Sequence, residues 1–560
     1  MFLDAEQRGG ADDIHGDVAI VGAGPAGIVL ALDLAHQGLD VVLVESGGRK
    51  FQPSVQDLGN AAEYDPARHA PMEDCTRRQI GGASVIWGGR CVPYDPIDFE
   101  HRTYVSESDW PVTYDEISSY FQRACDYFRC GRAVFDAHEI DAIEQKTIVP
   151  GLPDAEVRSS SLERWSLPTN FGHEFRRDLE SSRRIQLLHS LTCTEIEVDD
   201  SGSRITALRC RSLGSGRALE VTARAYVIAC GGIDTTRLLL ASNRVHANGI
   251  GNHSDNLGRF YMGHISGRVA RVCFTTPPRR TIYGFERDID GTYLKRRFSF
   301  SPEFQREHEL NNIVSFPVSP DIADPEHHNG VLSFAYLALA SPMGRAFAAD
   351  AIRKAAIGSG DDLRLLQHTR NMLLDPWSTL KFVPTFGYKR FIAHRKVPSF
   401  IQYSRSGIYP LHYHGEQVPN RESRITLSDQ RDELGMRRVS IDLRYTDRDV
   451  DSVVRAHQYW DRYLRDQDCG RLEYLADDVE QSVWNQAGDG FHQIGTTRMS
   501  SDPERSVVGP DCSVHGVGNL FVASSSIFVT SGQANSTFMI VAFALRMADH
   551  LREVTLAKEV

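Results

Sequence analysis

The pattern of apolar residues near the start of the chain predicts a strand–helix–strand unit over residues 17 to 45. This stretch reads DVAIVGAGPAGIVLALDLAHQGLDVVLVE. Val18 to Gly22 is a short run of apolar and small residues, typical of a buried strand in a parallel sheet. A helix is expected from about Pro25 to Gln37, because Pro favours the first helical turn and Gly38 can end the helix. A second buried strand is expected from Val41 to Val44.

Three glycines in this unit have the G-x-G-x-x-G spacing of a dinucleotide-binding loop. Gly22 allows a tight turn, Gly24 lets the backbone approach a pyrophosphate, and Gly27 lets the helix pack against the strand. Glu45 follows the second strand, where its carboxylate can accept hydrogen bonds from both hydroxyls of an adenosine ribose. The glycine spacing alone is weak evidence, but strand, loop, helix, strand and acid together predict that the chain binds a dinucleotide.

Two later segments concern the reactive part of that dinucleotide, and the second favours a flavin over a nicotinamide. Residues 77–90, RRQIGGASVIWGGR, predict a rigid loop whose glycines let backbone lie flat against a ring. From residue 185 the chain changes to short strands, the last of which ends at Gly231-Gly232 and leads into a helix through residues 236–240. A meander that feeds a glycine-ended strand is typical of the second cofactor contact in many flavoproteins.

The middle of the chain predicts a helix and an antiparallel sheet. Residues 110–130 predict one amphipathic helix with a capping box at its start. Between about 266 and 485, VLSFAYLALA and SFIQYSRSGIYPLHYHG are interpreted as strands, and SRITLS is expected to pair with VSIDLRY. These strands are expected to form one wall of a substrate cavity, backed by a helix from Asp447 to about Leu464. His412 and His414 would face the same side of their strand, but no third ligand at a supporting spacing suggests a metal site.

The carboxyl-terminal part is expected to return to the cofactor. FHQIGTTRM, residues 491–499, precedes a turn and a buried strand, and an apolar helix is expected from Thr537 onward. Ser536 or Asn535 could cap this helix. Its amino terminus would carry partial positive charge, which suits the negative charge of a reduced flavin.

Composition narrows the class of protein. A length of 560 residues predicts two structural domains with a large core, and a net charge of −12 argues against binding nucleic acid. The ten cysteines show no metal-ligand spacing and are interpreted as reduced thiols of a cytoplasmic protein. The first 16 residues lack the pattern of a signal peptide and are expected to be a flexible tail, and no apolar run is long enough to span a membrane.

Residues 368–397 mix aromatic side chains with cations, among them Lys381, Lys389, Arg390, Arg395 and Lys396. Contact with a membrane surface or a partner protein is one interpretation of this composition. A mobile lid or a solvated basic face is the interpretation favoured from the sequence.

Seven segments together resemble the glucose–methanol–choline (GMC) family of flavin oxidoreductases over nearly the whole chain. Within that family the sequence is most similar to the branch of pyranose 2-oxidase and the flavoprotein subunits of fructose and gluconate dehydrogenases. Each segment alone is a weak signal, and their shared order and spacing carry the resemblance. The segments are VGAGPAG, GGASVIWGG, WSLPTNFG, GNHSDNLGRFYMGH, EQVPNRESRITLSDQRDELG, FHQIGTTRM and SGQANST.

The resemblance implies a site for oxidising an alcohol. His492 takes the position of the family's catalytic histidine and Asn535 that of its partner. A histidine can accept the hydroxyl proton while hydride leaves carbon for flavin N5, and an asparagine can orient the substrate oxygen. His412 or Tyr413 is expected to contact the substrate. The residues expected to contact FAD are Gly22, Gly24, Pro25, Ala26, Gly27, Glu45, Ser46, Gly81, Gly82, Ser84, Trp87, Gly88, Gly89, Cys193, Cys230, Gly231, Ser525, Asn535 and Thr537.

The sequence departs from the family's pattern at three points. Pyranose 2-oxidase attaches FAD through a histidine where this chain has Ile86, so the flavin is expected to be non-covalent. Proline, frequent in the family, is replaced by Val529 and Ser536, which spares Asn535. The related dehydrogenase subunits travel to the periplasm with partner subunits, and no export signal is visible here.

The sequence therefore predicts an α/β protein with a Rossmann-like FAD-binding domain of the glutathione-reductase type and a second, substrate-binding domain built on an antiparallel sheet. The FAD-binding domain is expected over residues 15–100, 185–265 and 486–555, the substrate-binding domain over 101–184 and 266–485, and a flexible tail over 1–14. The expected activity is FAD-dependent oxidation of a CH–OH group of a sugar, glycoside or polyol, with oxygen, quinone or a protein as electron acceptor. The alternatives are the flavin subunit of an electron-transfer complex and a non-redox lyase of the same family.

Overall fold

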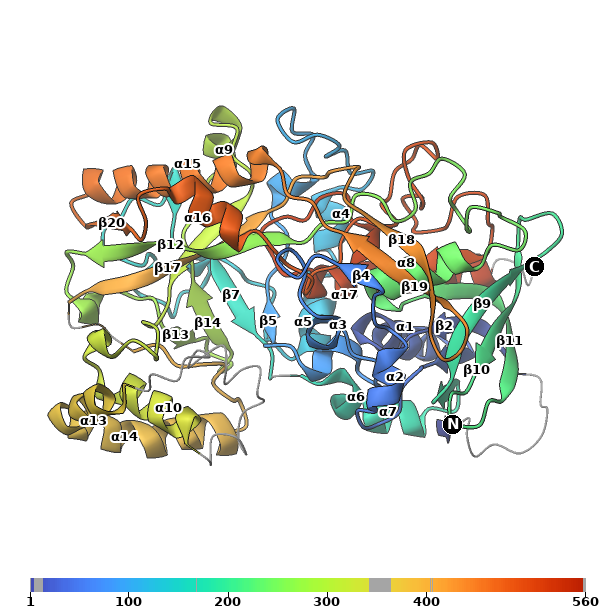
Figure 1. The fold of residues 1–560 in the computed structure, drawn as a ribbon, viewed down its shortest axis with the longest axis horizontal. Helices are drawn as coiled ribbons and strands as arrows, with labels where there is room; N and C mark the ends of the chain where they lie inside the picture. Colours follow the sequence, from blue (N-terminus) through green and yellow to red (C-terminus); the bar gives the residue numbers. More distant parts are fainter. Residues whose placement is uncertain are drawn as a thin grey trace.

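The computed structural model describes residues 2–4, 14–167, 169–341, 364–402, 404 and 406–556. Two regions lie side by side in Figure 1: a large sheet with helices on the right and a pair of smaller sheets on the left. Among the described residues no helix combines the length and apolar character needed to cross a membrane. All ten cysteines are free thiols, and nine of them are buried.

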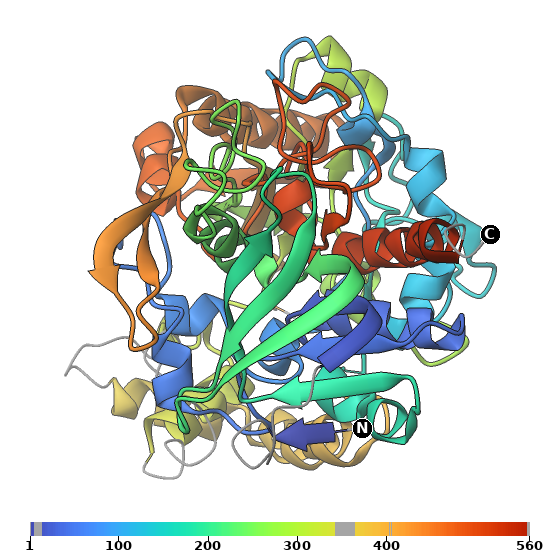
Figure 2. The same cartoon turned by 90° about the vertical axis from the view of Figure 1, so that its right-hand side faces the viewer.

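An eight-stranded sheet forms the nucleotide-binding half of the molecule. Strands β1, β8, β3, β2 and β11 run parallel, and β21 joins β11 in parallel, whereas β9, β10 and β11 form an antiparallel meander. The end view of Figure 2 shows this meander in front. The strands are β1 (Phe2–Asp4), β8 (Ile185–His189), β3 (Val41–Val44), β2 (Ile14–Val21), β11 (Ala218–Ile228), β10 (Ile205–Arg211), β9 (Thr192–Val198) and β21 (Leu520–Val522).

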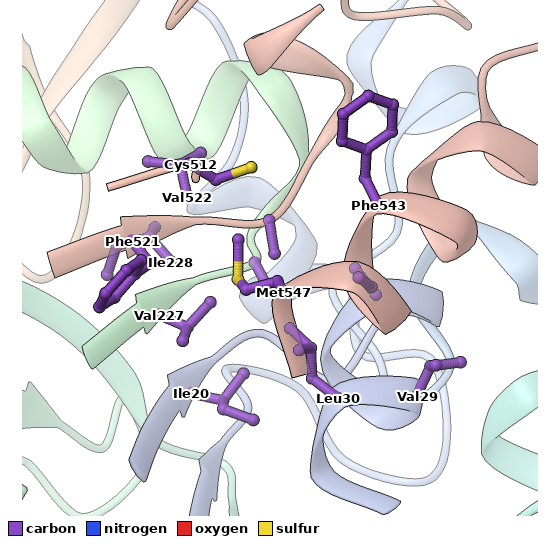
Figure 3. Close-up of a cluster of buried hydrophobic side chains, with 14 of the residues drawn as sticks. Ile20, Val29, Leu30, Val227, Ile228, Cys512, Phe521, Val522, Phe543 and Met547 are labelled. Atoms are coloured by element: carbon purple, nitrogen blue, oxygen red, sulfur yellow. The ribbon is translucent and has the colours of Figure 1, made fainter. Parts of the chain in front are cut away.

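Three helices begin near one edge of this sheet. Helix α1 (Pro25–His36) follows β2, α8 (Gly231–Ala241) follows β11, and α17 (Thr537–Leu556) packs along α1. Figure 3 shows their shared core, with Leu30 of α1 and Met547 of α17 over Ile20 and Val227 of the sheet. These side chains are buried between the helices and the sheet, and Val18–Val21 of β2 and all of β3 are buried on both faces, as expected for strands covered on both sides. The predicted strand–helix–strand unit is present.

A second sheet of four antiparallel strands carries the other half of the molecule. Its order is β16 (Ile313–Pro317), β17 (Ile408–Glu416), β12 (His264–Phe274) and β20 (Gly470–Tyr474). Helix α15 (Asp447–Asp466), predicted from Asp447 to about Leu464, covers one face with the buried side chains of Val450, Val453 and Trp460. Helix α16 (Val479–Gln486) packs beside it.

A third sheet brings distant parts of the chain together. Its order is β13 (Phe285–Arg287), β14 (Tyr293–Arg296), β7 (Leu162–Trp165) and β5 (Arg90–Cys91). Two further pairings are short. Strand β6 (Val157–Arg158) pairs with β15 (Ser299–Phe300), and β4 (Glu63–Tyr64) pairs with β19 (Arg437–Asp442). The mixed α/β fold with a sheet-based substrate region is therefore confirmed, and the division into two domains stays a prediction.

Several elements differ from their sequence-based predictions. VLSFAYLALA is not a strand but helix α10 (Gly330–Ala340), which Asn329 caps by accepting from the backbone N–H groups of Val331 and Leu332. A continuous apolar run cannot distinguish strand from helix, and here its Leu and Ala residues favour the helix. The predicted hairpin of β18 (Arg424–Arg431) and β19 forms, but it pairs with β4 instead of joining the substrate sheet.

Two further predictions need correction. The helix expected over residues 110–130 is broken into α4 (Tyr114–Ser118) and α5 (Phe121–Phe128), although one side is buried, with Ile117, Phe121 and Phe128, as an amphipathic helix requires. The expected tail is structured at both of its ends, because β1 pairs with β8 and β2 begins at Ile14. Residues 1 and 5–13 lie outside the described part.

The remaining helices connect these sheets or cover their edges. Helices α13 (Leu365–Leu374) and α14 (Pro376–Gly387) pack against α10, and a π-helical turn, η6 (Tyr388–Ile392), follows them. The others are α2 (Pro53–Asp57), α3 (Met72–Cys75), α6 (Phe171–Glu174), α7 (Arg176–Ser181) and α9 (Pro302–Glu307), with 3-10 turns that include η1 (Gly82–Val85) and η7 (Ser525–Ile527).

Candidate active site

A cleft that is partly open to solvent lies at the edge of the large sheet where α1, α8 and α17 begin. Gly24 and Pro25 of the first helix start, Gly231 of the second and Thr537 of the third line it. Each helix amino terminus presents unpaired backbone N–H groups and the positive end of the helix dipole. The cleft is therefore suited to an anionic group such as a pyrophosphate.

Three glycines at this edge, Gly22, Gly27 and Gly82, have no room for a side chain. Gly22 has φ +105°, and a Cβ there would lie 2.5 Å from the Ala229 carbonyl oxygen. A Cβ on Gly27 would lie 1.9 Å from the Gly22 carbonyl oxygen, so this glycine permits the close packing of α1 on the loop. A Cβ on Gly82 would lie 2.8 Å from the Cα of Gly24, which shows how closely the 77–90 loop crosses the first glycine loop.

Glu45 lies at the end of β3 with its carboxylate buried beside the cleft. Its Oε2 accepts from the backbone N–H of Ala23 and its Oε1 from that of Gly47, both at 2.8 Å. Burial raises the pKa of Glu45 above its usual value, and these two bonds act in the opposite direction. Each oxygen keeps a lone pair that could accept from a ribose hydroxyl.

Most residues predicted to contact a dinucleotide line this cleft. Those that do are Gly22, Gly24, Pro25, Ala26, Glu45, Ser46, Gly82, Ser84, Trp87, Cys193, Cys230, Gly231, Ser525 and Thr537. Gly27, Gly81, Gly88, Gly89 and Asn535 are not among its lining residues. Sequence reasoning did not identify Arg78, which also lines the cleft and links Ser46 to Asp234 through its guanidinium at 3.0 and 2.7 Å.

The structure brings His492 and Asn535 together beside the cleft. Asn535 Nδ2 lies 2.6 Å from His492 Nε2. Their neighbours in sequence, Phe491, Gln493 and Ser536, line the cleft itself. Two residues far apart in sequence, one on a loop and one just before α17, thus meet at the end of the proposed cofactor site.

His492 is also held from its other side by a carboxylate. Its Nδ1 lies 2.8 Å from Oδ2 of Asp489, which is buried. Burial tends to raise the pKa of Asp489, but the charges and hydrogen bonds of His492 and His264 outweigh it and hold that pKa well below its usual range. Asp489 is therefore a carboxylate at neutral pH and accepts a hydrogen bond from Nδ1.

Asn535 is oriented by Arg90 of β5. Arg90 Nη1 donates to Asn535 Oδ1 at 2.7 Å, and Nη2 donates to Glu163 Oε1 of β7 at 2.6 Å. Because a guanidinium can only donate, the asparagine oxygen faces Arg90 and its NH2 group faces His492. His492 Nε2 must then present a lone pair, so its proton lies on Nδ1.

Two further histidines complete the polar cluster. The ring of His264, at the start of β12, lies 4.5 Å from that of His492 and 4.4 Å from that of His414 on β17, centroid to centroid. Burial, assisted by the neighbouring His492, lowers the pKa of His264 to about 4, and burial also places the pKa of His414 well below its usual range. Both rings are neutral at neutral pH.

These three histidines form a group in which one ring nitrogen of each lies within 4.8 Å of the others, close enough to share a metal ion. Sequence spacing could not reveal this group, because its members come from three separate segments. His492 Nδ1 and His414 Nδ1 already have partners, Asp489 and the Gln533 carbonyl. The expectation that the site uses no metal stays a prediction.

The two substrate residues expected from the sequence face opposite sides of β17. His412 and His414 share a side, and His412 lies against Phe316 with a pKa lowered to about 3 by burial and by the cations Arg268, Lys295 and Arg90. Tyr413 points to the other side, where its ring meets His457 of α15. The structure thus does not bring Tyr413 together with His492.

Sequence reasoning missed Asp489, Arg90, Glu163 and His264. A signal existed for Asp489, which precedes His492 by three residues, a spacing at which a turn can join the two side chains. The other three come from β5, β7 and β12, whose pairing depends on strand register across distant segments.

The residues of the cleft fit FAD. Helix amino termini would hold the pyrophosphate, Glu45 would accept from the ribose, and glycines leave room for backbone contact where a Cβ would collide. The polar pair His492–Asn535 then lies next to the cleft, where an alcohol could be oxidised.

Comparisons with known proteins agree with this geometry. Residues 419–544 match the GMC oxidoreductase family, and residues 15–56 match the family described as FAD binding domain. A 6'''-hydroxyparomomycin C oxidase of Streptomyces lividus is 25% identical over 98% of this chain and 94% of its own length. A 2-methyl-1,2-propanediol dehydrogenase of Mycolicibacterium austroafricanum is 22% identical over 96% of this chain and 95% of its own.

A solved structure supports the fold independently. The pyridoxine 4-oxidase from Mesorbium loti covers 95% of this chain and 98% of its own with a TM-score of 0.52, at 17% sequence identity. At this identity the likeness concerns the fold alone. The cleft, the matched segments and the relatives together identify residues 419–544 as a GMC oxidoreductase domain and the chain as an FAD-dependent oxidoreductase that acts on a CH–OH group.

Proposed function

We propose that the chain oxidises a hydroxyl-bearing carbon of a sugar, glycoside or polyol, with His492 as the base and Asn535 as the residue that orients the hydroxyl. The observation that carries the proposal is the continuous series of hydrogen bonds Glu163–Arg90–Asn535–His492–Asp489. The residues at the two ends of the series, Glu163 and Asp489, both have buried carboxylates. Such a series leaves one ring nitrogen of His492, Nε2, as the proton acceptor.

The proton step follows from this arrangement. A substrate hydroxyl that enters between His492 and Asn535 donates to Nε2 and accepts from the Asn535 NH2 group. His492 takes the hydroxyl proton as C–H cleavage proceeds, and Asp489 stabilises the imidazolium that forms. The Arg90 guanidinium, one hydrogen bond behind Asn535, favours the negative charge that develops on the substrate oxygen.

Bound FAD supplies the two-electron acceptor that takes the hydride from carbon. The protein has to hold the C–H bond toward it and keep competing water away. His264 and His414 are suited to line this enclosed site. Both rings are buried and neutral, so they add polar edges without adding charge. His412 is the better candidate of the two substrate residues named from the sequence, because it shares a side of β17 with His414.

The substrate class rests on the relatives. Their names describe an oxidase of a hydroxyparomomycin and a dehydrogenase of a branched propanediol, so the shared element is a hydroxyl on a polar carbon skeleton. We extend this element to the present chain. The same proposal assigns residues 15–100, 185–265 and 486–555 to FAD binding, and 101–184 with 266–485 to the substrate.

The attachment of FAD is also part of the proposal. Ile86, in the position of the linking histidine of pyranose 2-oxidase, is an aliphatic side chain that cannot form such a bond. Non-covalent FAD held by the cleft residues is therefore expected.

The test is an anaerobic titration of the yellow protein with a panel of sugars, glycosides, polyols and diols. The absorbance of the oxidised flavin should disappear with at least one member, and admission of air or a quinone should restore it if that acceptor is used. A lyase would convert its substrate while the flavin stays oxidised. Flavin that no alcohol of the panel reduces, in a protein that retains FAD, would contradict the proposal.

A further inference from the structure

Large apolar side chains gather on the exposed face of α13, α14 and η6. Of the 16 large apolar side chains exposed in the described part of the chain, nine belong to these three consecutive elements, so they form one surface and not scattered residues. Leu366, Trp377, Leu373 and Leu374 are 87%, 81%, 75% and 71% exposed. We call this surface the α13–α14 patch; it consists of Leu365, Leu366, Leu373, Leu374, Trp377, Leu380, Val383, Tyr388 and Ile392.

Helix α13 has its polar side inward, because His368 and Asn371 are its buried residues. Helix α14 buries Thr379, and its half-buried Phe382 and Phe386 pack on each other and on Phe400. His368 Nδ1 lies 3.0 Å from Ser333 Oγ of α10, and Asn371 donates to the Pro325 carbonyl at 2.8 Å. A helix on the surface of a globular protein normally places its apolar side inward and its polar side toward water. The reversed arrangement of α13, together with the exposed apolar residues of α14, indicates that something apolar covers the outer side.

The segment that contains the patch is strongly basic on an acidic protein. Residues 364–397 contain seven Lys and Arg and one acidic residue, Asp375, a local net charge of +6 on a chain whose total is −12. In the described part of the chain none of these seven cations forms an ion pair. Arg390 and Arg395 donate to backbone carbonyls, those of Val397 and Arg129.

We propose that the α13–α14 patch docks on the surface of an anionic lipid bilayer. Leu and Trp beside Lys and Arg are the composition of helices that lie in the membrane interface, with apolar residues among the acyl chains and cations at the headgroups. Trp377 and Tyr388 suit the boundary between the two layers. Helices of 10 and 12 residues are too short to span, so they lie along the surface.

The position and charge of the patch favour a lipid surface over a second copy of the chain. Figure 1 shows α10, α13 and α14 as an outer layer beyond β13 and β14, on the side away from α15, where a flat surface could reach them. Two copies that met through this face would bring two local charges of +6 together, and like charges repel. Negative lipid headgroups neutralise the same charge.

The experiment is flotation of the full-length, flavin-loaded protein with lipid vesicles, which does not depend on its activity. Vesicles of phosphatidylcholine with phosphatidylglycerol should carry the protein to the top of the gradient, and pure phosphatidylcholine should carry much less. Raising the salt concentration should release it, because the cations are exposed. The bound flavin, measured by absorbance, reports that each variant is folded.

Two pairs of variants make the test specific. Leu373→Ser with Trp377→Ser should lower the vesicle partition coefficient at least about tenfold, because two exposed apolar side chains no longer enter the bilayer. The matched control, Val245→Ser with Leu475→Ser, changes exposed apolar residues elsewhere and should bind as the wild type does.

The second pair tests the charge. Lys381→Glu with Lys389→Glu should lower binding to phosphatidylglycerol vesicles by more than about tenfold. Lys50→Glu with Arg183→Glu makes the same change in net charge at exposed positions elsewhere and should keep most of the binding.

Three results would overturn the proposal. One is equal or absent binding to the two kinds of vesicle. The second is an equal loss in the control variants, since binding would then not involve the patch. The third is a dimer, or a complex with another protein, that the patch variants disperse while vesicle binding is unchanged.

Discussion

Replacing Asp489 by Asn tests the hydrogen bonds that prepare His492 as a base. The carboxylate accepts three bonds: from His492 Nδ1 at 2.8 Å and the backbone N–H of His264 at 2.7 Å on Oδ2, and from the backbone N–H of Phe491 at 2.8 Å on Oδ1. An amide has one oxygen in place of two. In either orientation of the new amide, its NH2 group therefore faces a group that itself donates.

The two orientations give the limits of the expected effect. If the NH2 group faces His492, the ring must accept at Nδ1 and carry its proton on Nε2, which removes the base and lowers the rate by up to about 10⁴. If the oxygen faces His492, the tautomer survives but a charge-assisted bond becomes neutral, a loss of about 1.5–3 kcal/mol or about 10–200-fold. We expect the rate of flavin reduction to fall between these limits.

The assay is anaerobic stopped-flow reduction of the flavin by a saturating substrate, followed at pH 7 and at alkaline pH. The deficit of Asp489→Asn should shrink as pH rises, because an alcohol that ionises on its own no longer needs a base. A purely structural role would lower flavin content or stability without this pH dependence. Asp477→Asn, at an exposed carboxylate that precedes α16, is the control. A yellow Asp489→Asn protein reduced at the wild-type rate would refute the assignment.

Three other predictions follow from the same structure. Asn535→Ala should retain FAD and lose about 1–3 kcal/mol of transition-state stabilisation, measured as kcat/KM, and an unchanged kcat/KM would exclude a contact with substrate. Acid precipitation should release the flavin into the supernatant, since Ile86 cannot link it; flavin retained in the pellet would refute this. Stability should be highest above about pH 6.5 and decline toward pH 4, because burial lowers the pKa of His457 to about 4 while an unfolded histidine binds its proton near pH 6.5. This one residue contributes a slope of about 1.4 kcal/mol per pH unit there, and thermal unfolding of His457→Gln should show a shallower decline.

The sequence predicted the cofactor half of the molecule well because its signals are local. The strand, glycine loop, helix and acid of residues 17–45 all lie within one unit, so periodicity and spacing are sufficient. Gly22 and Gly27 occupy positions where a Cβ would collide with backbone, as their spacing indicated. His492 and Asn535 were named by resemblance, and the structure brings their side chains together at 2.6 Å.

The residues that orient this pair could not be predicted in the same way. Arg90 and Glu163 meet because β5 and β7 pair in one particular register, and nothing local to either segment specifies that register. Helix α10, which was predicted as a strand, has a continuous apolar run with neither a helical nor a strand period. Only the length and composition of such a run can distinguish a helix from a strand. The sequence favours a mobile lid or a solvated basic face for residues 368–397, because the charges are visible in the sequence whereas the inward direction of His368 and Asn371 is not.

The central claim is that His492 accepts the substrate proton, and flavin reduction in His492→Ala measures it most directly. The variant should bind FAD, keep its yellow colour and melt near the wild-type temperature, while anaerobic reduction by substrate slows about 10²–10⁴-fold at neutral pH. Alkaline pH should restore part of the rate. A folded, yellow His492→Ala protein that substrate reduces as fast as the wild type would contradict the account.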